Sequence, residues 1–291
     1  MSTVLDTPIA PLRGPGFWKR ARRNPSFMIG LVLSLLLLLT AGLSFVWTPH
    51  DPYEIDMALK LRPPGGTYWL GTDPFGRDIA SLLLVGARAS IVVGVIAVGI
   101  GLVIGTALGL LASAKRGWVE EAIMRGSDFG FAFPAILSAI MLTAVFGPGM
   151  VNAIIAIGIY NIPTFARITR ASANAIWGRE FVLAARACGK GSFAITIEHV
   201  LPNILSVLIV QATIRFAIAI LAEAALSYLG LGTQPPQPSW GRMLSEAQTL
   251  LFQAPRLAVF PGLAIAFAVM GLNLLGDGLR DLFDPRLARK R

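Results

Sequence analysis

The sequence predicts an all-α membrane protein that crosses the bilayer six times, and three observations indicate this fold class. Of the 291 residues, 55% are hydrophobic and only 14% are charged, whereas a soluble domain carries about 25% charged residues. Six mostly apolar runs meet or approach the length of about 20 residues that a helix needs to cross the hydrocarbon core. Lys and Arg are also concentrated in alternate connecting segments, as expected of a protein with several spans.

The expected spans cover residues 27–47, 91–111, 129–146, 151–168, 204–231 and 257–275. Arg20, Arg22 and Arg23 precede the first span, as in a signal peptide, but its apolar core is too long and no small-residue cleavage site follows, so we expect it to be retained. The third and fourth spans are the shortest. Gly147-Pro148-Gly149 lies between them and predicts a tight turn, which makes the pair a helical hairpin.

The distribution of Lys and Arg orients the spans. Eighteen of the 25 fall in segments that are cytoplasmic if the amino terminus is cytoplasmic, six fall in the outer segments, and Arg215 lies within a span. Because positive residues stay on the cytoplasmic side, both termini are predicted to be cytoplasmic. Residues 1–26 then form an N-terminal cytoplasmic tail, and residues 27–291 form one transmembrane unit without room for a separate soluble domain.

Several classes of function are disfavoured by composition. The formal charge of +9 is explained by topology better than by nucleic-acid binding. Cys188 is the single cysteine, and His50 and His199 are the only histidines and are far apart, so neither an intrachain disulfide nor a metal site is expected. No catalytic constellation is recognisable. Gly189-Lys190-Gly191-Ser192 lacks the first Gly and the Ser or Thr after Lys of a phosphate-binding loop, so we expect no cofactor in this chain.

The inner segment 169–203 is polar, cationic and long for a connection between spans. Residues 180–188 consist of helix formers and stop at Gly189, a C-cap residue. A second short helix is expected at 193–200, and Pro202 begins the fifth span. Spacing alone leaves two interpretations open, a helix lying on lipid headgroups or a helix that contacts a protein.

The residues of this segment carry a resemblance. Ala184-Ala185-x3-Gly189, followed by Leu201-Pro202, resembles the cytoplasmic loop motif Glu-Ala-Ala-x3-Gly-x9-Ile-x-Leu-Pro of ABC importer permeases. Leu183 stands in place of the Glu and His199 in place of the Ile. The resemblance implies a coupling helix that docks on an ATPase subunit, with Glu180 as the acidic group. The implied contact residues are Glu180, Leu183, Ala184, Ala185, Arg186, Gly189, Lys190, Leu201 and Pro202.

Two further signatures extend the resemblance. Residues 70–78 with Gly86-Ala87-Arg88 look like the outer loop of the dipeptide, oligopeptide and nickel permeases, and residues 223–232 with Ser239-Trp240-Gly241 are similar to their fifth span and the loop after it. The pattern resembles the C-type permease of the pair and implies a type I ABC importer permease fold. Related importers receive a binding protein on this side, so the candidate contacts are Asp73, Arg77, Trp240 and Arg242; the alternatives are an outer turn without a partner and a Trp anchored in the headgroups.

Polar residues within the spans are candidates for the translocation path. Arg215 is expected near mid-membrane with a polar partner or cavity around it, while Glu223, near the outer interface, is either a solvated cap or part of the path. Asn152 and Asn161 are candidates too, or supply hydrogen bonds between helices. Gly101, Gly105 and Gly109 form a small-residue stripe that packs either within this chain or against a second permease.

The resemblance implies a non-enzymatic permease subunit of an ABC importer for di- or oligopeptides in the bacterial inner membrane. It implies four kinds of partner: a second homologous permease, two ATPase subunits that bind ATP and Mg²⁺, an external substrate-binding protein, and the lipid bilayer. Nickel, or another small solute such as glutathione, remains an alternative cargo. A stand-alone channel or secondary carrier is the alternative class, and it would need ionisable residues along its path, for which only Arg215 and Glu223 are available.

Overall fold

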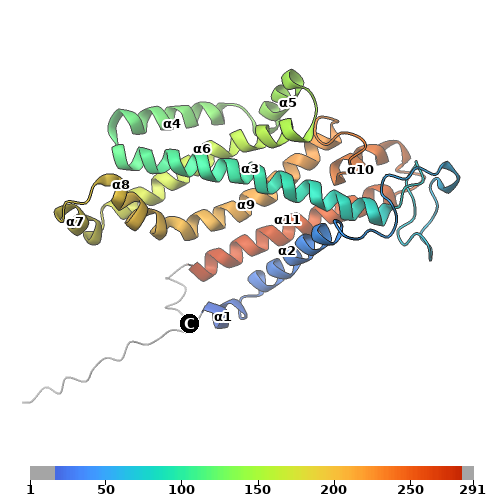
Figure 1. Cartoon of the computed structure of the whole chain (residues 1–291), viewed down its shortest axis with the longest axis horizontal. Coiled ribbons are helices and arrows are strands. Elements are labelled where there is room, and N and C mark those ends of the chain that lie inside the picture. Colours follow the sequence, from blue (N-terminus) through green and yellow to red (C-terminus); the bar gives the residue numbers. More distant parts are fainter. Residues whose placement is uncertain (1–16, 284–291) are drawn as a thin grey trace, which may run out of the picture.

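A computed structural model describes residues 17–283, and these residues form an elongated bundle of long helices (Figure 1). The principal helices are α2 (Pro25–Leu43), α3 (Ile79–Lys115), α4 (Gly117–Ala132), α5 (Ala135–Phe146), α6 (Met150–Trp177), α9 (Leu201–Tyr228) and α11 (Arg256–Phe283). The shorter elements are α1 (Phe17–Ala21), α7 (Glu180–Ala187), α8 (Ser192–Ile195), a π-helical turn (Thr196–Val200), α10 (Trp240–Ala247) and two single turns (Met57–Leu59 and Gln248–Leu250). Five helices are long and apolar enough to cross a membrane, or six spans if α4 and α5 count as one.

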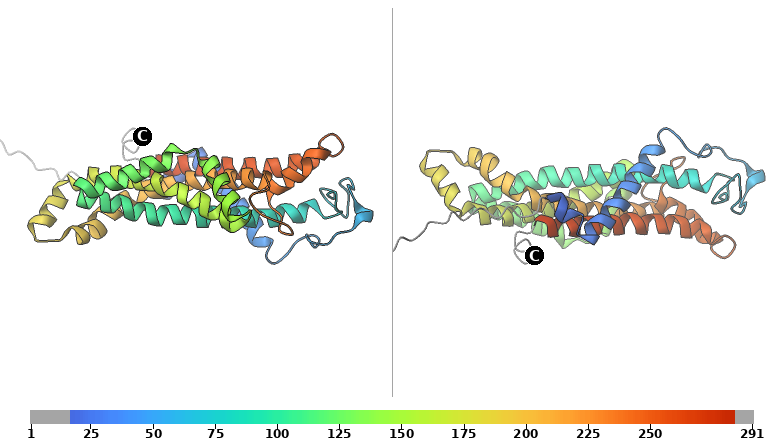
Figure 2. Two further views of the ribbon diagram at one scale, coloured as in Figure 1. Left: turned by 90° about the horizontal axis from the view of Figure 1, so that it is seen from above. Right: turned by 90° about the horizontal axis from the view of Figure 1, so that it is seen from below.

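Two helix pairs, with α9 between them, make up the bundle. The most extensive contacts join α3 to α6 and α2 to α11, and α9 packs against α3, α6 and α11. The two views in Figure 2 show that the bundle is long and flat, with α7 and α8 projecting from one end and the loop before α3 from the other. The ends of the described chain, in α1 and α11, lie toward the α7 end (Figure 1), as the predicted orientation requires.

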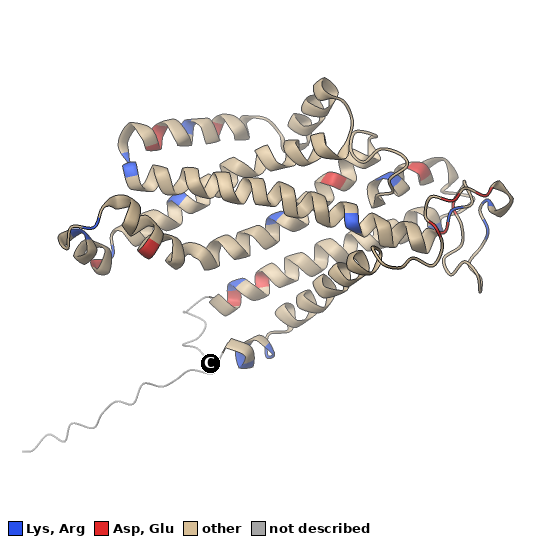
Figure 3. Ribbon diagram, viewed as in Figure 1, with Lys and Arg blue, Asp and Glu red and all other residues tan. Residues whose placement is uncertain are grey.

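Most charged residues lie toward the two ends of the bundle, with a few in its middle (Figure 3), which fits an apolar middle embedded in lipid. The first sixteen residues of the predicted cytoplasmic tail and the C-terminal cations Arg286, Arg289, Lys290 and Arg291 lie outside the described residues.

The helices differ from the predicted spans mainly at their ends. The first span begins two residues early, because the Asn24 side chain caps α2 by accepting a hydrogen bond from the Phe27 amide at 3.0 Å, and it ends at Leu43 rather than residue 47. The second begins twelve residues early, at Ile79, where Asp78 accepts from the Ser81 amide at 2.9 Å. The outer loop is therefore shorter than expected. The fourth and sixth spans extend to Trp177 and Phe283, so less of residues 169–203 is loop.

The single third span at 129–146 was wrong as a continuous helix. Phe133, before Pro134, has an extended backbone, and the adjoining helices α4 and α5 are bent by 83°. The physical reason is Pro134, which has no amide hydrogen and whose ring disfavours the helical conformation at the preceding residue. The turn at residues 147–149 between α5 and α6 agrees with the predicted hairpin, since α5 contacts α6.

The predicted break between a short helix and the fifth span at Pro202 is absent. Residues 192–228 run as one 37-residue helix, and its π-helical turn Thr196–Val200 ends one residue before Leu201-Pro202, which continue the helix as α9. Pro202 cannot donate to the carbonyl four residues earlier, and the wider turn accommodates that missing hydrogen bond. The short helix expected at 193–200 is thus the inner end of the fifth span.

The glycine stripe of α3 packs within the chain. A Cβ atom at Gly101, Gly105 or Gly109 would collide with Asn161, with Ile162 and Phe165, or with Ala166 and Thr169, all of which belong to α6. Since the three glycines follow the line of contact between α3 and α6, the interpretation as packing within one chain is the one that this structure supports.

Candidate functional site

The cytoplasmic tip has the predicted order of helix, glycine and helix. Helix α7 ends at Ala187, and Gly189 follows with a φ of +82°. The amide of Gly189 donates to the Arg186 carbonyl at 2.9 Å, and the Lys190 amide donates to the Ala185 carbonyl at 3.1 Å. These bonds close the end of the helix in the way that a glycine in the left-handed region allows. The tip is therefore a defined structure rather than an irregular loop.

A few contacts fix α7 to the bundle. Val182 is fully buried, and the Arg186 guanidinium lies 4.9 Å from the centre of the Trp177 ring, a cation–π distance. The Trp177 indole in turn donates to the Ser113 hydroxyl at 3.2 Å, which connects the end of α6 with the end of α3. Any force on α7 is consequently passed to the helices that hold it.

Several large apolar side chains are exposed at this tip, and among them the Phe181 ring lies 6.2 Å from the His199 ring, edge to face. We refer to these exposed side chains together as the apolar surface of the tip. Its large members are Phe181, Leu183, Phe193 and Ile197, with exposed fractions from 45% to 82%. Leu183, which replaces the Glu of the motif, belongs to this surface, and Ala184 is exposed beside it. Glu180 is exposed at the first turn of α7, and Lys190 forms an exposed ion pair with Glu198. Leu201 and Pro202 lie behind this surface, at the start of α9.

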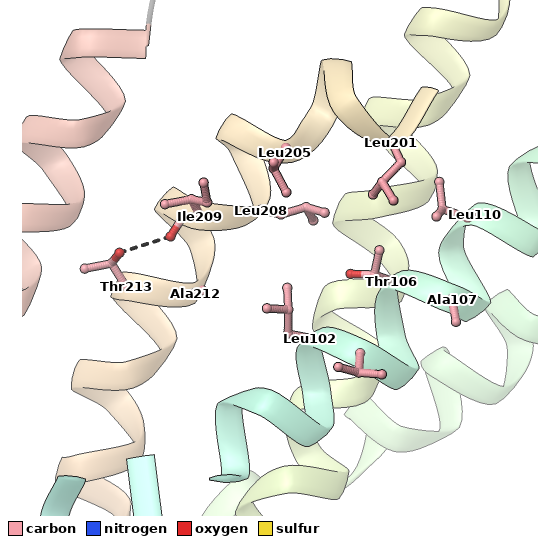
Figure 4. A pocket seen from close by; sticks show the side chains of 11 residues that line it. Leu102, Thr106, Ala107, Leu110, Leu201, Leu205, Leu208, Ile209, Ala212 and Thr213 are labelled. Atoms are coloured by element: carbon pink, nitrogen blue, oxygen red, sulfur yellow. Dashed lines mark hydrogen bonds between the residues drawn. The ribbon is translucent and has the colours of Figure 1, made fainter. Parts of the chain in front are cut away.

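An apolar cavity of about 530 Å³ lies between α3 and α9 (Figure 4). Its lining residues come from these two helices: Leu102, Val103, Thr106, Ala107, Leu110, Leu201, Leu205, Leu208, Ile209, Ala212 and Thr213. The Thr106 hydroxyl is buried without a hydrogen-bond partner, while Thr213 donates to the Ile209 carbonyl at 3.0 Å. The sequence offered no signal for this cavity, because each lining residue is also an ordinary residue of a membrane span.

Of the four candidate path residues, Arg215 and Glu223 lie on α9. Arg215 is half-buried, and its Nε atom has no hydrogen-bond partner. Glu223 is only 1% exposed, so the interpretation as a solvated cap was wrong. Its Oε1 atom accepts hydrogen bonds from the hydroxyls of Ser227 at 2.6 Å and Thr233 at 3.2 Å, which connect α9 to the outer loop behind it.

The two asparagines, Asn152 and Asn161, both contact neighbouring helices. Asn152 on α6 donates to the carbonyls of Phe146 at 3.0 Å and Gly147 at 2.8 Å, where α5 ends, so it forms the predicted hydrogen bonds between helices. Asn161 is buried and packs on Gly101 of α3. Gln211, a half-buried residue one turn before Arg215, is a polar residue that the sequence analysis did not single out, because it carries no charge.

The four candidate contacts for a binding protein are joined to one another or buried. Arg77 Nε lies 2.6 Å from Asp73, and Arg77 Nη2 lies 2.9 Å from Glu246, which also accepts from Arg242 at 2.9 Å. Trp240 is 4% exposed, and its indole donates to the Leu83 carbonyl at 3.0 Å. Asp73 and Trp240 therefore hold the outer loop and α10 against the bundle, and the interpretation of Trp240 as a headgroup anchor was wrong.

Family comparisons agree with this geometry. Residues 101–289 match the family described as the inner membrane component of binding-protein-dependent transport systems. Residues 16–64 match the N-terminal transmembrane domain of oligopeptide transport permease C. The first match covers well over half of the chain.

Relatives and a solved structure match along most of the chain. The dipeptide transport system permease protein DppC of Alkalihalophilus pseudofirmus is 41% identical over 97% of this chain and 92% of its own length. The glutathione transport system permease protein GsiD of Escherichia coli is 44% identical over 93% of this chain and 90% of its own. A structure of the methionine ABC transporter MetNI, in an inward-facing conformation, matches with a TM-score of 0.59 at 19% identity, over 70% of this chain and 97% of that one.

The likeness to MetNI supports the fold alone, whereas the sequence matches define the relationship. The all-α bundle, the five or six apolar helices and the helix–glycine–helix tip are the features that such a relationship requires. The chain belongs to the family of ABC importer permeases, as a multi-pass subunit of the inner membrane.

Proposed function

We propose that this chain is one of two permease subunits of an ATP-driven importer of di- or oligopeptides. The assembly would contain a second homologous permease, two ATPase subunits that bind ATP and Mg²⁺, and an external substrate-binding protein. The observation that carries this proposal is the apolar surface of the tip, whose side chains Phe181, Leu183, Phe193 and Ile197 remain 45% to 82% exposed. A surface of this kind is typical of a site that another protein covers.

The geometry supports a mechanism of coupling. An ATPase that moves α7 would act on Gly189 and on the continuous helix of residues 192–228, which reaches from the tip to the outer end of the bundle. Since α9 also borders the cavity beside α3, a shift of this helix changes the width of that cavity. Chemical energy from a separate subunit would thus open and close a path without any catalytic residue in this chain.

The path itself would lie along the face that α3 and α9 share. Val103 of α3 and Leu205 of α9 line the cavity, and both side chains are exposed on the surface of this chain. A second permease that packs against this face would enclose a path between the two subunits. An apolar, weakly specific lining suits an importer in which the external binding protein selects the cargo.

Glutathione is the second candidate cargo, because relatives as similar as the dipeptide permease are glutathione transport permeases. The testing experiment measures uptake of labelled dipeptide, tripeptide, hexapeptide, glutathione and nickel in cells with and without this gene. Loss of one class of peptide would support the proposal and define the cargo. Loss of glutathione or nickel uptake alone would identify that solute as the cargo instead. Unchanged uptake of all five solutes would reject the proposed peptide cargo.

A further inference from the structure

Arg215 lies half-way along α9, with 14 residues before it and 13 after it in the helix Leu201–Tyr228. At about 1.5 Å per residue its Cα atom is about 20 Å from the outer end of α9 at Tyr228, and the same helix continues inward past Leu201 to Ser192. A guanidinium cannot be discharged at ordinary pH, so at this depth it must be compensated by an anion, by water or by a polar cavity.

The described part of the chain supplies no anion for Arg215. No carboxylate of residues 17–283 forms an ion pair with it, and its buried Nε atom has no hydrogen-bond partner. Glu223 is two turns further along α9 and accepts its hydrogen bonds from Ser227 and Thr233. The guanidinium therefore has no compensating anion within the described residues, and an anion from outside the chain could supply one.

Arg215 also lies on the face of α9 that borders the cavity. Leu201, Leu205, Leu208 and Ala212 line the cavity in Figure 4 at successive spacings of four, three and four residues. The next position of that series is 215, and such spacings keep side chains on one face of a helix.

The part of α3 that lies opposite Arg215 leaves space beside the helix. Phe216 packs on Gly94, which places the neighbouring residues of α3 beside Arg215. A Cβ atom added at Gly99 would meet nothing within 4 Å, and Val95 is exposed. No side chain at Gly99 therefore separates the cavity between α3 and α9 from the Arg215 guanidinium.

We infer that Arg215 binds the C-terminal carboxylate of a peptide as it crosses the membrane. This inference rests on the proposed peptide cargo and names the group that the path recognises. A terminal carboxylate is common to peptides of every sequence, so one cation can hold them all without reading their side chains. A half-buried guanidinium forms stronger hydrogen bonds to a carboxylate than an exposed one does, because the local dielectric is low.

The test uses the complete transporter, with its ATPases, partner permease and binding protein, in proteoliposomes. Uptake of a dipeptide with a free C-terminus is divided by uptake of the same dipeptide with a C-terminal amide, for the wild type and for Arg215→Gln. Any preference of the binding protein for the free acid is the same in both and cancels when the two ratios are compared. We expect Arg215→Gln to lower the ratio at least about tenfold, the effect of losing a hydrogen bond to a charged group.

Two variants serve as controls. Arg215→Lys keeps the positive charge and should retain most of the preference for the free acid. Arg88→Gln removes another arginine, one that donates to Ser44 at 2.7 Å near the outer end of α2, and should leave the ratio unchanged. Co-purification of the partner subunits and ATP hydrolysis stimulated by the binding protein show whether each variant has folded and assembled.

An equal fall in the uptake of acid and amide by Arg215→Gln would overturn the inference, since Arg215 would then pair with a group of the second permease or stabilise the fold. Normal uptake of both by that variant would overturn it as well. If the wild-type transporter carries neither dipeptide, the proposed cargo fails and the inference fails with it. Failure of the inference alone is recognised by wild-type peptide uptake together with an unchanged ratio.

Discussion

Single glycines determine the geometry at two places for different reasons. At Gly189 the backbone has a φ of +82°, a conformation that L-residues with side chains rarely adopt. At Gly105 the backbone is helical, and the constraint is space: a Cβ atom would lie 2.5 Å from the Ile162 carbonyl oxygen of α6. The first glycine shapes a turn at the cytoplasmic tip, and the second allows two helices to approach closely.

Replacing Gly189 by Pro should uncouple ATP hydrolysis from uptake. Proline fixes φ near −65°, so α7 could not leave the tip in its present direction. We expect uptake to fall at least about tenfold, which corresponds to about 1.4 kcal/mol, while insertion and ATP hydrolysis persist. Gly191→Pro is the matched control, because Gly191 already has a φ of −70°. Normal uptake by Gly189→Pro in the reconstituted transporter would show that α7 does not transmit the ATPase movement.

Replacing Gly105 by Ala should destabilise the contact between α3 and α6. The added methyl group meets backbone that cannot move aside locally, and overpacking of this kind costs about 1–3 kcal/mol. Gly99→Ala, six residues earlier in the same helix, meets nothing within 4 Å and should be neutral or slightly stabilising. Thermal unfolding of the purified protein in detergent checks both. Equal melting temperatures for the two variants would contradict the close contact.

Residue identity predicted some of these sites and missed others. Gly189 was predictable as a cap, since a run of helix formers ends there. The burial of Trp240 and Asp73 was not predictable, because it depends on α10 packing on α3, contacts between residues far apart in sequence. Gln211 was overlooked because a search for ionisable groups passes over an amide.

At the scale of elements, the apolar pattern predicts that helices exist better than where they end. All six expected runs are helical in large part, yet α3 begins twelve residues early at its Asp78 cap. Arg88 made that first part of α3 look like loop. The two prolines have opposite effects. Pro134 separates α4 from α5, whereas Pro202 is accommodated by a π-helical turn within a continuous helix. The sequence around a proline does not distinguish these outcomes, since tertiary contacts of the flanking helices decide them.

Replacing Pro134 by Ala should straighten the α4–α5 pair, since the amide hydrogen is restored and the restriction on Phe133 is removed. Spin labels at the exposed positions Trp118 and Val145, in a chain with Cys188 replaced by Ser, report the change by double electron–electron resonance. The label distance should lengthen toward about 40 Å, the rise of 27 residues of straight helix. An unchanged distance would mean that packing of α5 against α6 and α9, rather than the proline, maintains the bend.

At the scale of the whole molecule, the two ends of the bundle differ in the chemistry of their side chains. The outer end is closed by the ion pairs of Asp73, Arg77, Arg242 and Glu246, which join the loop before α3 to α10. The inner end presents apolar side chains around α7 and α8. The number of spans, five or six, was predictable from hydropathy, because the bilayer sets the length of an apolar helix, while the distribution of charge predicts the orientation. The cavity between α3 and α9 was not, since it depends on how the helices cross.

Cys188 tests this polarity without an engineered probe, because it is the single cysteine and is exposed at the cytoplasmic tip. A membrane-impermeant maleimide should label it in inverted vesicles and not in right-side-out vesicles. Removal of the proposed ATPase subunits should increase the labelling rate, since they would cover the tip. A cysteine placed at Gly65, in an exposed outer loop, should show the reverse sidedness. Labelling of Cys188 from the outside would reject the orientation, and labelling unaffected by the ATPases would reject docking at this surface.

The unbroken helix of residues 192–228 has a mechanical consequence. Its 37 residues extend about 55 Å, against a hydrocarbon thickness of about 30 Å. A rigid rod of that length that pivots by about 10° at its outer end moves its inner end sideways by about 10 Å. A small change of angle at the outer end and a large displacement of the inner end are therefore geometrically equivalent. If the proposed ATPases displace the inner end by that amount, the outer part of the helix moves far less, so the proposed path would be adjusted only slightly.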